Sequence, residues 1–110
     1  MRGISIDGII LVYLSSKLLI NYEMLKVLAF MKQVATGLQM EGNFGTAHVY
    51  RSSLNAIIAY RGKKDFVFSE VTSEWLKGFE VYLRSRGCSW NTVSTYLRTF
   101  RAVYNRAVDL

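Results

Sequence analysis

The chain has 110 residues, of which 51% are hydrophobic, and a formal net charge of +6 at pH 7. This length suits one domain with a modest core, and the positive charge favours a polyanionic partner: nucleic acid first, a membrane surface second. A single cysteine and a single histidine exclude an intrachain disulfide and any zinc site built from Cys or His clusters. The lone thiol fits a reducing, cytoplasmic compartment, and the absence of proline favours long helices.

The first 21 residues differ in pattern from the rest, so we predict an N-terminal extension over 1–21 and a helical domain over 22–110. Asp7-Gly8 between short apolar runs is a hairpin signal. The apolar run over residues 9–14 is too short to span a bilayer, and no small-residue cleavage pattern follows it. We therefore expect neither a membrane association nor a targeting role, but an extension or the end of an upstream element.

A broad apolar stripe predicts a first helix from about Tyr22 to Leu38. The stretch EGNFGT, with two glycines and an asparagine, predicts a loop after it. Thr46 is the predicted N-cap of a second helix, because its hydroxyl can accept a hydrogen bond from a free backbone N–H. That helix runs from about Ala47 to Tyr60. Its polar side carries His48, Arg51, Ser52 and Asn55.

The stretch RGKKDFVFSEVT, residues 61–72, connects the second helix to a third. We expect three of its apolar side chains to plug the core: Phe66, Phe68 and Val71. Thr72 or Ser73 caps the third helix, and Gly87 is expected just past its C-terminus. With a fourth helix after Gly87, the sequence predicts an all-α fold, a small bundle of about four helices.

The fourth helix is predicted from SWNTVSTYLRTFRAVYNRA, residues 89–107, with Ser89 or Asn91 as its cap. At about 100° per residue, its apolar residues fall within one arc: Val93, Tyr96, Leu97, Phe100, Val103, Tyr104 and Ala107. The other side carries Thr95, Arg98, Thr99, Ala102 and Arg106, with Arg101 at its flank.

The positive charge is concentrated in this C-terminal third. Between Val81 and Val108 there is no acidic residue but five arginines: Arg84, Arg86, Arg98, Arg101 and Arg106. The nine other basic residues are nearly balanced by eight acidic ones. We therefore expect a polyanion to bind on this part of the domain.

The sequence contains no catalytic constellation that we recognise. Its glycines form neither a P-loop nor a dinucleotide-binding pattern, and Glu70, Glu74 and Glu80 are scattered rather than paired for acid–base chemistry. A lone His48 on a polar helix side is more often a surface contact than a general base. We predict that this chain alone is not an enzyme and uses no cofactor and no metal.

Two helix N-termini favour nucleic-acid binding. Free N–H groups there suit phosphate oxygens, and short hydroxyl or amide side chains add contacts. In both GTAHVYRSSLN and SWNTVSTYLR an arginine follows within two turns; Arg bridges phosphates or reads guanine, and Asn reads adenine. Helix capping and solvated arginines explain the same residues equally well, so the pattern alone leaves both interpretations open.

In their order and spacing, these segments resemble the core-binding (SAM-like, N-terminal) domain of tyrosine recombinases and phage-type integrases. The similarity is greatest to integrases of conjugative transposons and phages in Bacteroidetes-type bacteria, and it covers roughly residues 24–110. It rests on Gly45-Thr46 with Tyr50 and Leu54, on Phe79-Glu80-x-Tyr82-Leu83, on Ser89-x-Asn91-Thr92, and on Tyr96-Leu97-Arg98 with Ala102-x-Tyr104-Asn105-x-Ala107.

The resemblance implies a non-catalytic domain over 22–110 that forms half of a clamp around double-stranded DNA at a recombination site. A C-terminal catalytic domain of the same full-length protein, with Arg, Lys and His residues and a tyrosine nucleophile, would cleave and join the strands. Its motifs do not occur in these 110 residues. That domain, further recombinase protomers and DNA are the implied partners. The implied DNA face comprises Thr46, His48, Arg51, Ser52, Asn55, Ser89, Asn91, Thr92, Thr95, Arg98 and Arg101.

A helical SAM-like protein–protein interaction module is the alternative function. It predicts an apolar patch on the surface in place of a basic one, and an association that added DNA does not change.

Overall fold

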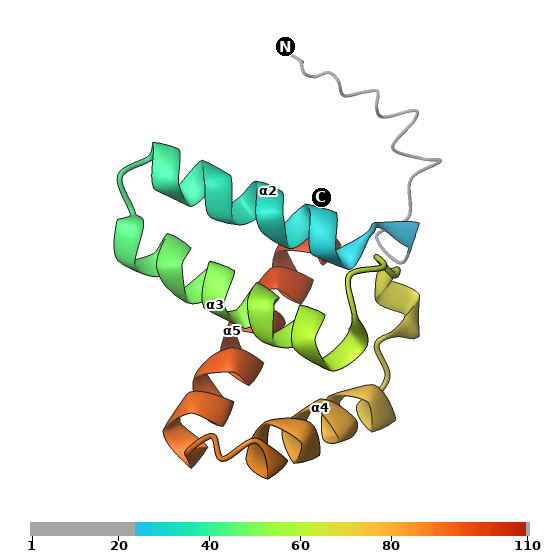
Figure 1. The fold of residues 1–110 in the computed structure, drawn as a ribbon. Helices are drawn as coiled ribbons and strands as arrows, with labels where there is room; N and C mark the ends of the chain where they lie inside the picture. Colours follow the sequence, from blue (N-terminus) through green and yellow to red (C-terminus); the bar gives the residue numbers. More distant parts are fainter. Residues whose placement is uncertain (1–23, 110) are drawn as a thin grey trace.

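The computed structural model describes residues 24–109, which form helices and connections without a strand (Figure 1). The four α-helices are α2 (Val27–Met40), α3 (Phe44–Arg61), α4 (Ser73–Ser85) and α5 (Trp90–Val108). A short 3-10 helix, η2 (Phe68–Glu70), lies between α3 and α4. The predicted all-α bundle of about four helices is confirmed. The predicted extension over 1–21 and its hairpin lie outside the described residues.

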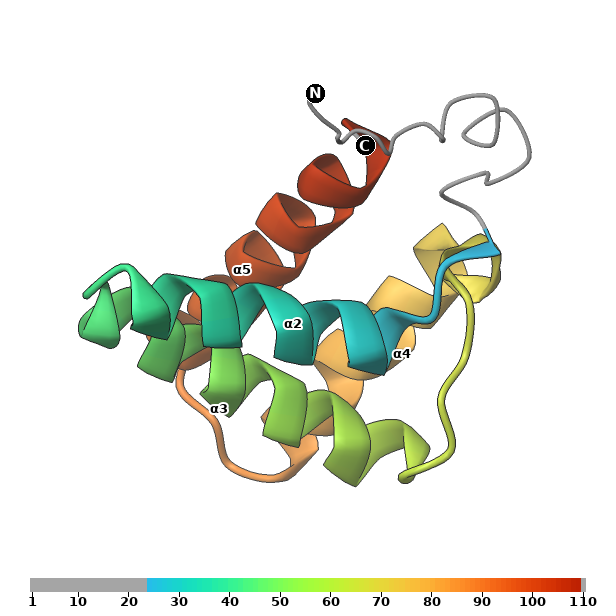
Figure 2. The same cartoon turned by 90° about the horizontal axis from the view of Figure 1, so that it is seen from above.

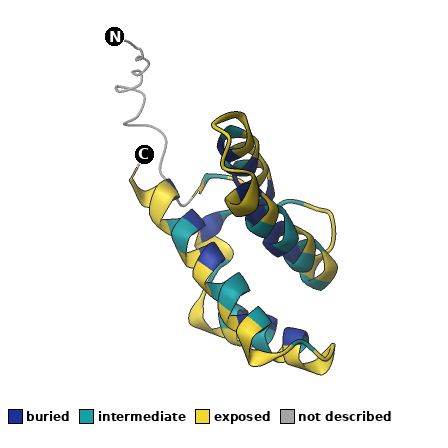
Figure 3. Ribbon diagram, turned by 90° about the vertical axis from the view of Figure 1, so that its left-hand side faces the viewer, coloured by how far each residue is buried: buried dark blue, intermediate teal, exposed yellow. Residues whose placement is uncertain are grey.

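Helices α2 and α3 are antiparallel neighbours, and α5 crosses behind them (Figures 1 and 2). Helix α4 packs against both α3 and α5. Helix α5 also contacts α2 and α3, and thus touches each of the other three helices. Figure 3 shows that the buried residues lie on the sides of the helices that face one another. Within residues 24–109, no helix combines the length and the apolar character needed to cross a membrane.

The apolar stripes of the sequence form the core. Each helix contributes buried residues at helical spacing: Val27, Leu28, Met31, Ala35 and Leu38 from α2; Ala47, Tyr50, Leu54 and Ile57 from α3; Trp75, Phe79 and Leu83 from α4; and Val93, Phe100, Val103 and Ala107 from α5. Phe66 and Phe68 are each 2% exposed, which confirms that the connection before α4 plugs the core, and Val71 packs half-buried at its edge.

The caps of α4 and α5 follow the local sequence. Thr72 Oγ1 accepts a hydrogen bond from Trp75 N at 3.1 Å, and Ser89 Oγ accepts one from Thr92 N at 3.2 Å. Gly87 has φ +88°, a left-handed conformation that side chains disfavour, and it allows a Schellman ending of α4. In that ending Gly87 N donates to Arg84 O, and Cys88 N donates to Leu83 O.

The start of α3 differs from the prediction. Thr46 is not the N-cap: α3 begins at Phe44, with Asn43 as its N-cap residue. The reason is that the Asn43 carbonyl already accepts from Ala47 N at 2.9 Å, which places Gly45 and Thr46 inside the first turn. Gly45 therefore does not break the helix, and the Thr46 hydroxyl is not used as a cap.

Thr99 also differs from the prediction, which placed it on the solvent side of α5. It is 8% exposed. Helix α3 packs on this side of α5 as well, so α5 is covered over more of its circumference than its apolar stripe indicates.

Helix α2 is capped from a distant part of the chain. Its own N-cap residue, Lys26, supplies no side-chain hydrogen bond. Instead, Leu28 N donates to Asp65 Oδ1 at 2.8 Å and Ala29 N donates to Asp65 Oδ2 at 3.0 Å. A carboxylate at a helix N-terminus satisfies free N–H groups and interacts favourably with the helix dipole. Asp65 thus ties the connection after α3 to the start of α2.

Asp65→Ala is expected to lower the free energy of unfolding by about 1–2 kcal/mol, because both α2 amides lose their acceptor. Urea denaturation followed by circular dichroism measures the loss. Asp65→Asn, which keeps an acceptor oxygen, should lose less, and Lys63→Ala in the same connection should change little. Equal losses in Asp65→Ala and Lys63→Ala would contradict a specific capping role.

Candidate nucleic-acid interface

A groove runs along the surface between α3 and α5. It consists of three adjoining hollows: the middle one shares Ser52 and Tyr96 with one neighbour and Val49 and Thr95 with the other. We call this surface the α3–α5 groove. One end lies near the start of α3, and the other reaches the turn between α4 and α5.

Eight of the eleven residues predicted for the DNA face line this groove. Most of them follow at intervals of three or four residues along their helix, a spacing that keeps side chains on one side of it. They are Thr46, His48, Ser52 and Asn55 from α3, and Asn91, Thr92, Thr95 and Arg98 from α5. The structure thus brings together two segments that are separated by the whole of α4.

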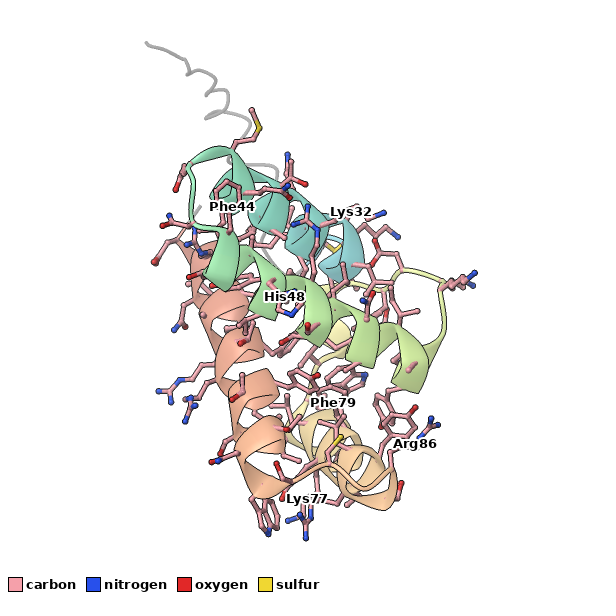
Figure 4. All side chains as sticks on the ribbon, turned by 60° about the vertical axis from the view of Figure 1, so that its left-hand side comes forward. Lys32, Phe44, His48, Lys77, Phe79 and Arg86 are labelled. Atoms are coloured by element: carbon pink, nitrogen blue, oxygen red, sulfur yellow. The ribbon has the colours of Figure 1, made fainter. Side chains whose placement is uncertain are left out.

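The groove carries only positive charge. None of its lining residues is Asp or Glu, and an arginine lies toward each end: Arg86 at one and Arg98 at the other. The one ion pair within residues 24–109 joins Arg61 to Glu70, so neither groove arginine is neutralised by a described carboxylate. His48 lies between them, exposed on α3 (Figure 4).

Arg86 is a groove residue that the sequence reasoning missed. It is one of the five arginines between Val81 and Val108, but the predicted DNA face does not include it. In the structure its Nη1 donates to the Tyr82 hydroxyl at 3.4 Å, and its side chain projects outward at the groove end (Figure 4). The signal that could have found it is the acid-free window from Val81 to Val108, which includes Arg86.

At the start of α5, the residue that caps the helix does not line the groove, whereas residues of its first turns do. The Ser89 hydroxyl caps the helix and also donates to Thr92 Oγ1 at 3.2 Å, and Ser89 does not line the groove. Asn91 is exposed, and no side-chain cap involves it. Thr95 Oγ1 donates to Asn91 O at 2.9 Å, and both residues line the groove.

Two predicted arginines lie away from the groove. Arg51 Nη2 donates to Thr36 Oγ1 of α2 at 3.5 Å. Arg101 lines a different hollow of about 560 Å³ between α4 and α5, together with Lys77 and Glu80. We call that hollow the α4–α5 groove. The structure therefore does not bring Arg51 and Arg101 to the surface formed by the other predicted residues.

The lining of the α3–α5 groove carries groups that can hydrogen-bond to a polyanion. It offers guanidinium, imidazole, amide and hydroxyl groups, which donate hydrogen bonds to phosphate oxygens or base edges. Within residues 24–109, no three His, Cys, Asp or Glu side chains gather closely enough to hold a metal ion. The groove thus has the charge and the hydrogen-bonding groups that fit a polyanion.

Comparison with known families identifies the family of this domain. The family model of the phage integrase SAM-like domain matches residues 26–110. No curated protein and no solved structure matches the chain. The match confirms the resemblance to the N-terminal, non-catalytic region of integrases, whereas the narrower resemblance to integrases of Bacteroidetes-type bacteria stays a prediction. The chain belongs to the phage integrase SAM-like domain family and is an integrase-type recombinase domain.

Proposed function

We propose that this chain is the DNA-binding domain of a site-specific tyrosine recombinase and that its α3–α5 groove holds the duplex of the recombination site. The observation that carries the proposal is the convergence of polar and basic side chains from two helices on one surface without a carboxylate. Such a surface attracts the phosphate backbone and steers association. The family assignment supports DNA as the polyanion.

In this proposal the residues of the groove have distinct roles. Arg86 and Arg98 bind phosphates toward its two ends, which fixes the position of the domain on the duplex. The amides of Asn55 and Asn91 reach base edges, where adenine offers a matching donor and acceptor. Hydroxyl groups add phosphate contacts from Thr46, Ser52, Thr92 and Thr95.

The chemistry belongs to another part of the full-length protein. We propose that this chain binds without catalysing, in the cytoplasm where the genome lies, while a catalytic domain cleaves and joins the strands and several protomers assemble on the DNA. The motifs around Thr46, Tyr82 and Asn91 further support a relationship to integrases of conjugative transposons in Bacteroidetes-type bacteria.

Arg98→Ala is expected to weaken binding to a DNA duplex about fivefold to tenfold at moderate salt, because one phosphate contact is lost. The slope of log affinity against log salt concentration should fall by about 1. Fluorescence anisotropy with a labelled duplex over a salt series measures both. Glu41→Ala, an exposed change outside the groove, should not weaken binding, and an affinity independent of salt would contradict the proposal.

One observation favours the protein-interaction alternative as a second candidate. Most of the surface that lines the α4–α5 groove is apolar, and Leu76, Leu97 and Phe100 are among its residues. NMR titration separates the two functions: duplex DNA should shift residues 46–55 and 91–98, whereas association between protein chains should shift Leu76 and Leu97 as the concentration rises, with or without DNA.

A further inference from the structure

The turn from α4 to α5 carries an exposed tryptophan that the proposed function does not use. Trp90, the first residue of α5, is 58% exposed, whereas the other described tryptophan, Trp75, is 8% exposed and packs in the core. The Arg84 guanidinium lies over the Trp90 ring, with Cζ 4.2 Å from the ring centroid. We call these two residues the Arg84–Trp90 corner.

The corner is held in place before any ligand arrives. Arg84 Nη1 donates to Cys88 O at 3.1 Å, and the sharp turn at Gly87, with φ +88°, brings that carbonyl back toward α4. The guanidinium is thereby fixed on one face of the indole. Since more than half of the Trp90 surface stays exposed with that face covered, the opposite face is open. A restrained platform loses little conformational entropy on binding.

The corner is linked to the α3–α5 groove through Cys88. Cys88, whose carbonyl accepts the hydrogen bond from Arg84, also lines the groove beside Arg86. The sequence from Val81 to Val108 contains no acidic residue. Trp and Arg are common anchors of protein–protein interfaces as well, but a positively charged setting that adjoins a basic groove favours a polyanion over an ordinary protein surface.

We propose that Trp90 and Arg84 form a stacking site for an unpaired DNA base next to the duplex held in the groove. An open aromatic face with a cation beside it is the usual chemistry of single-strand recognition. An intact duplex hides its base faces, whereas cleavage and exchange of strands expose them. The inference rests on the proposed function of the groove as a duplex-binding surface.

Two labelled DNAs with the same base pairs test this proposal: an uninterrupted duplex and the same duplex with a short bulge of unpaired thymines. Trp90→Ala in the full chain is expected to lower the affinity for the bulged DNA about tenfold and that for the uninterrupted duplex less than about twofold. Trp90→Phe, which keeps a ring, should retain most of the affinity. Val81→Ala, which shortens an apolar side chain of similar exposure, 57%, should change neither.

Tryptophan fluorescence gives an independent readout, because Trp90 is exposed and Trp75 is buried. The bulged DNA should quench the emission of the parent chain much more than the uninterrupted duplex does, and Trp90→Ala should remove this difference. An unchanged affinity of Trp90→Ala for the bulged DNA would overturn the inference. An equal loss on both DNAs would also overturn it, because Trp90 would then be a general duplex contact.

A third result would overturn it in favour of a protein partner: Trp90→Ala binds both DNAs like the parent chain but no longer associates with a second copy. Failure of the proposed function looks different, because the parent chain would then not bind the uninterrupted duplex. Circular dichroism of Trp90→Ala verifies that the exposed substitution leaves the helices intact.

Discussion

Replacing both Arg86 and Arg98 with glutamate is expected to lower the affinity for duplex DNA roughly 100-fold at about 0.1 M salt. The two arginines lie toward opposite ends of the α3–α5 groove, and no carboxylate lines the surface between them. Each reversal removes one phosphate contact and adds a charge that repels the backbone. The slope of log affinity against log salt concentration should therefore fall by about 2.

The matched control is Lys63→Glu with Lys64→Glu, which changes the net charge by the same amount. Both lysines are exposed in the connection after α3, and neither lines the groove. Anisotropy titrations over a salt series should show a loss of less than about threefold for this pair. If the two double variants lost affinity equally, net charge alone would explain binding, and the groove would have no special role.

The fold could be predicted because its signals are local. Apolar residues at helical spacing identify the buried side of each helix. Thr72 marks the start of α4, Gly87 its end and Ser89 the start of α5, each through a bond to a residue within four positions. A cap made by a residue far along the chain gives no such pattern. Asp65 bonds α2 amides 37 and 36 residues away, so nothing near Lys26 in the sequence indicates it.

The groove residues could be predicted from the sequence where the pattern of a single helix shows on which side they lie. The polar sides of α3 and α5 contain eight of the groove residues, because a single helix already separates them from its apolar stripe. A helical wheel shows which residues share one side of a helix, but it does not show which neighbouring helix packs against each side. Thr99 is buried because α3 packs on that side of α5, Arg51 reaches α2, and Arg101 faces the α4–α5 groove.

The place of Arg86 in the groove could not be predicted from the pattern of a single helix. Arg86 belongs to neither helix of the groove, and the packing of the end of α4 beside α3 brings it to the groove end. Its sequence context, at the end of a helix, is equally typical of an arginine that merely interacts with the helix dipole. Position in three dimensions decides between these roles, and position depends on how α4 packs on α3 and α5.

The second large effect is expected in the core. Phe68→Ala should lower the free energy of unfolding by about 3–5 kcal/mol, as for other buried phenylalanines. Phe68 is 2% exposed, and its ring centroid lies 6.0 Å from that of Phe30, 6.3 Å from that of Phe100 and 6.0 Å from that of Tyr104. One side chain from η2 thus joins α2 to α5, and the loss is a large share of the stability of a small domain.

Phe44→Ala makes the same chemical change at a position that is 65% exposed, and it should alter the free energy of unfolding by no more than about 0.5 kcal/mol. Urea denaturation of the two variants and the parent chain measures their free energies of unfolding. The values can be compared when the free energy falls with urea concentration at the same slope in all three. A loss below about 1 kcal/mol for Phe68→Ala would mean that the ring cluster does not hold α2 against α5. A loss of the expected size would show that the connection before α4 stabilises the domain by holding α2 and α5 together through the Phe68 ring.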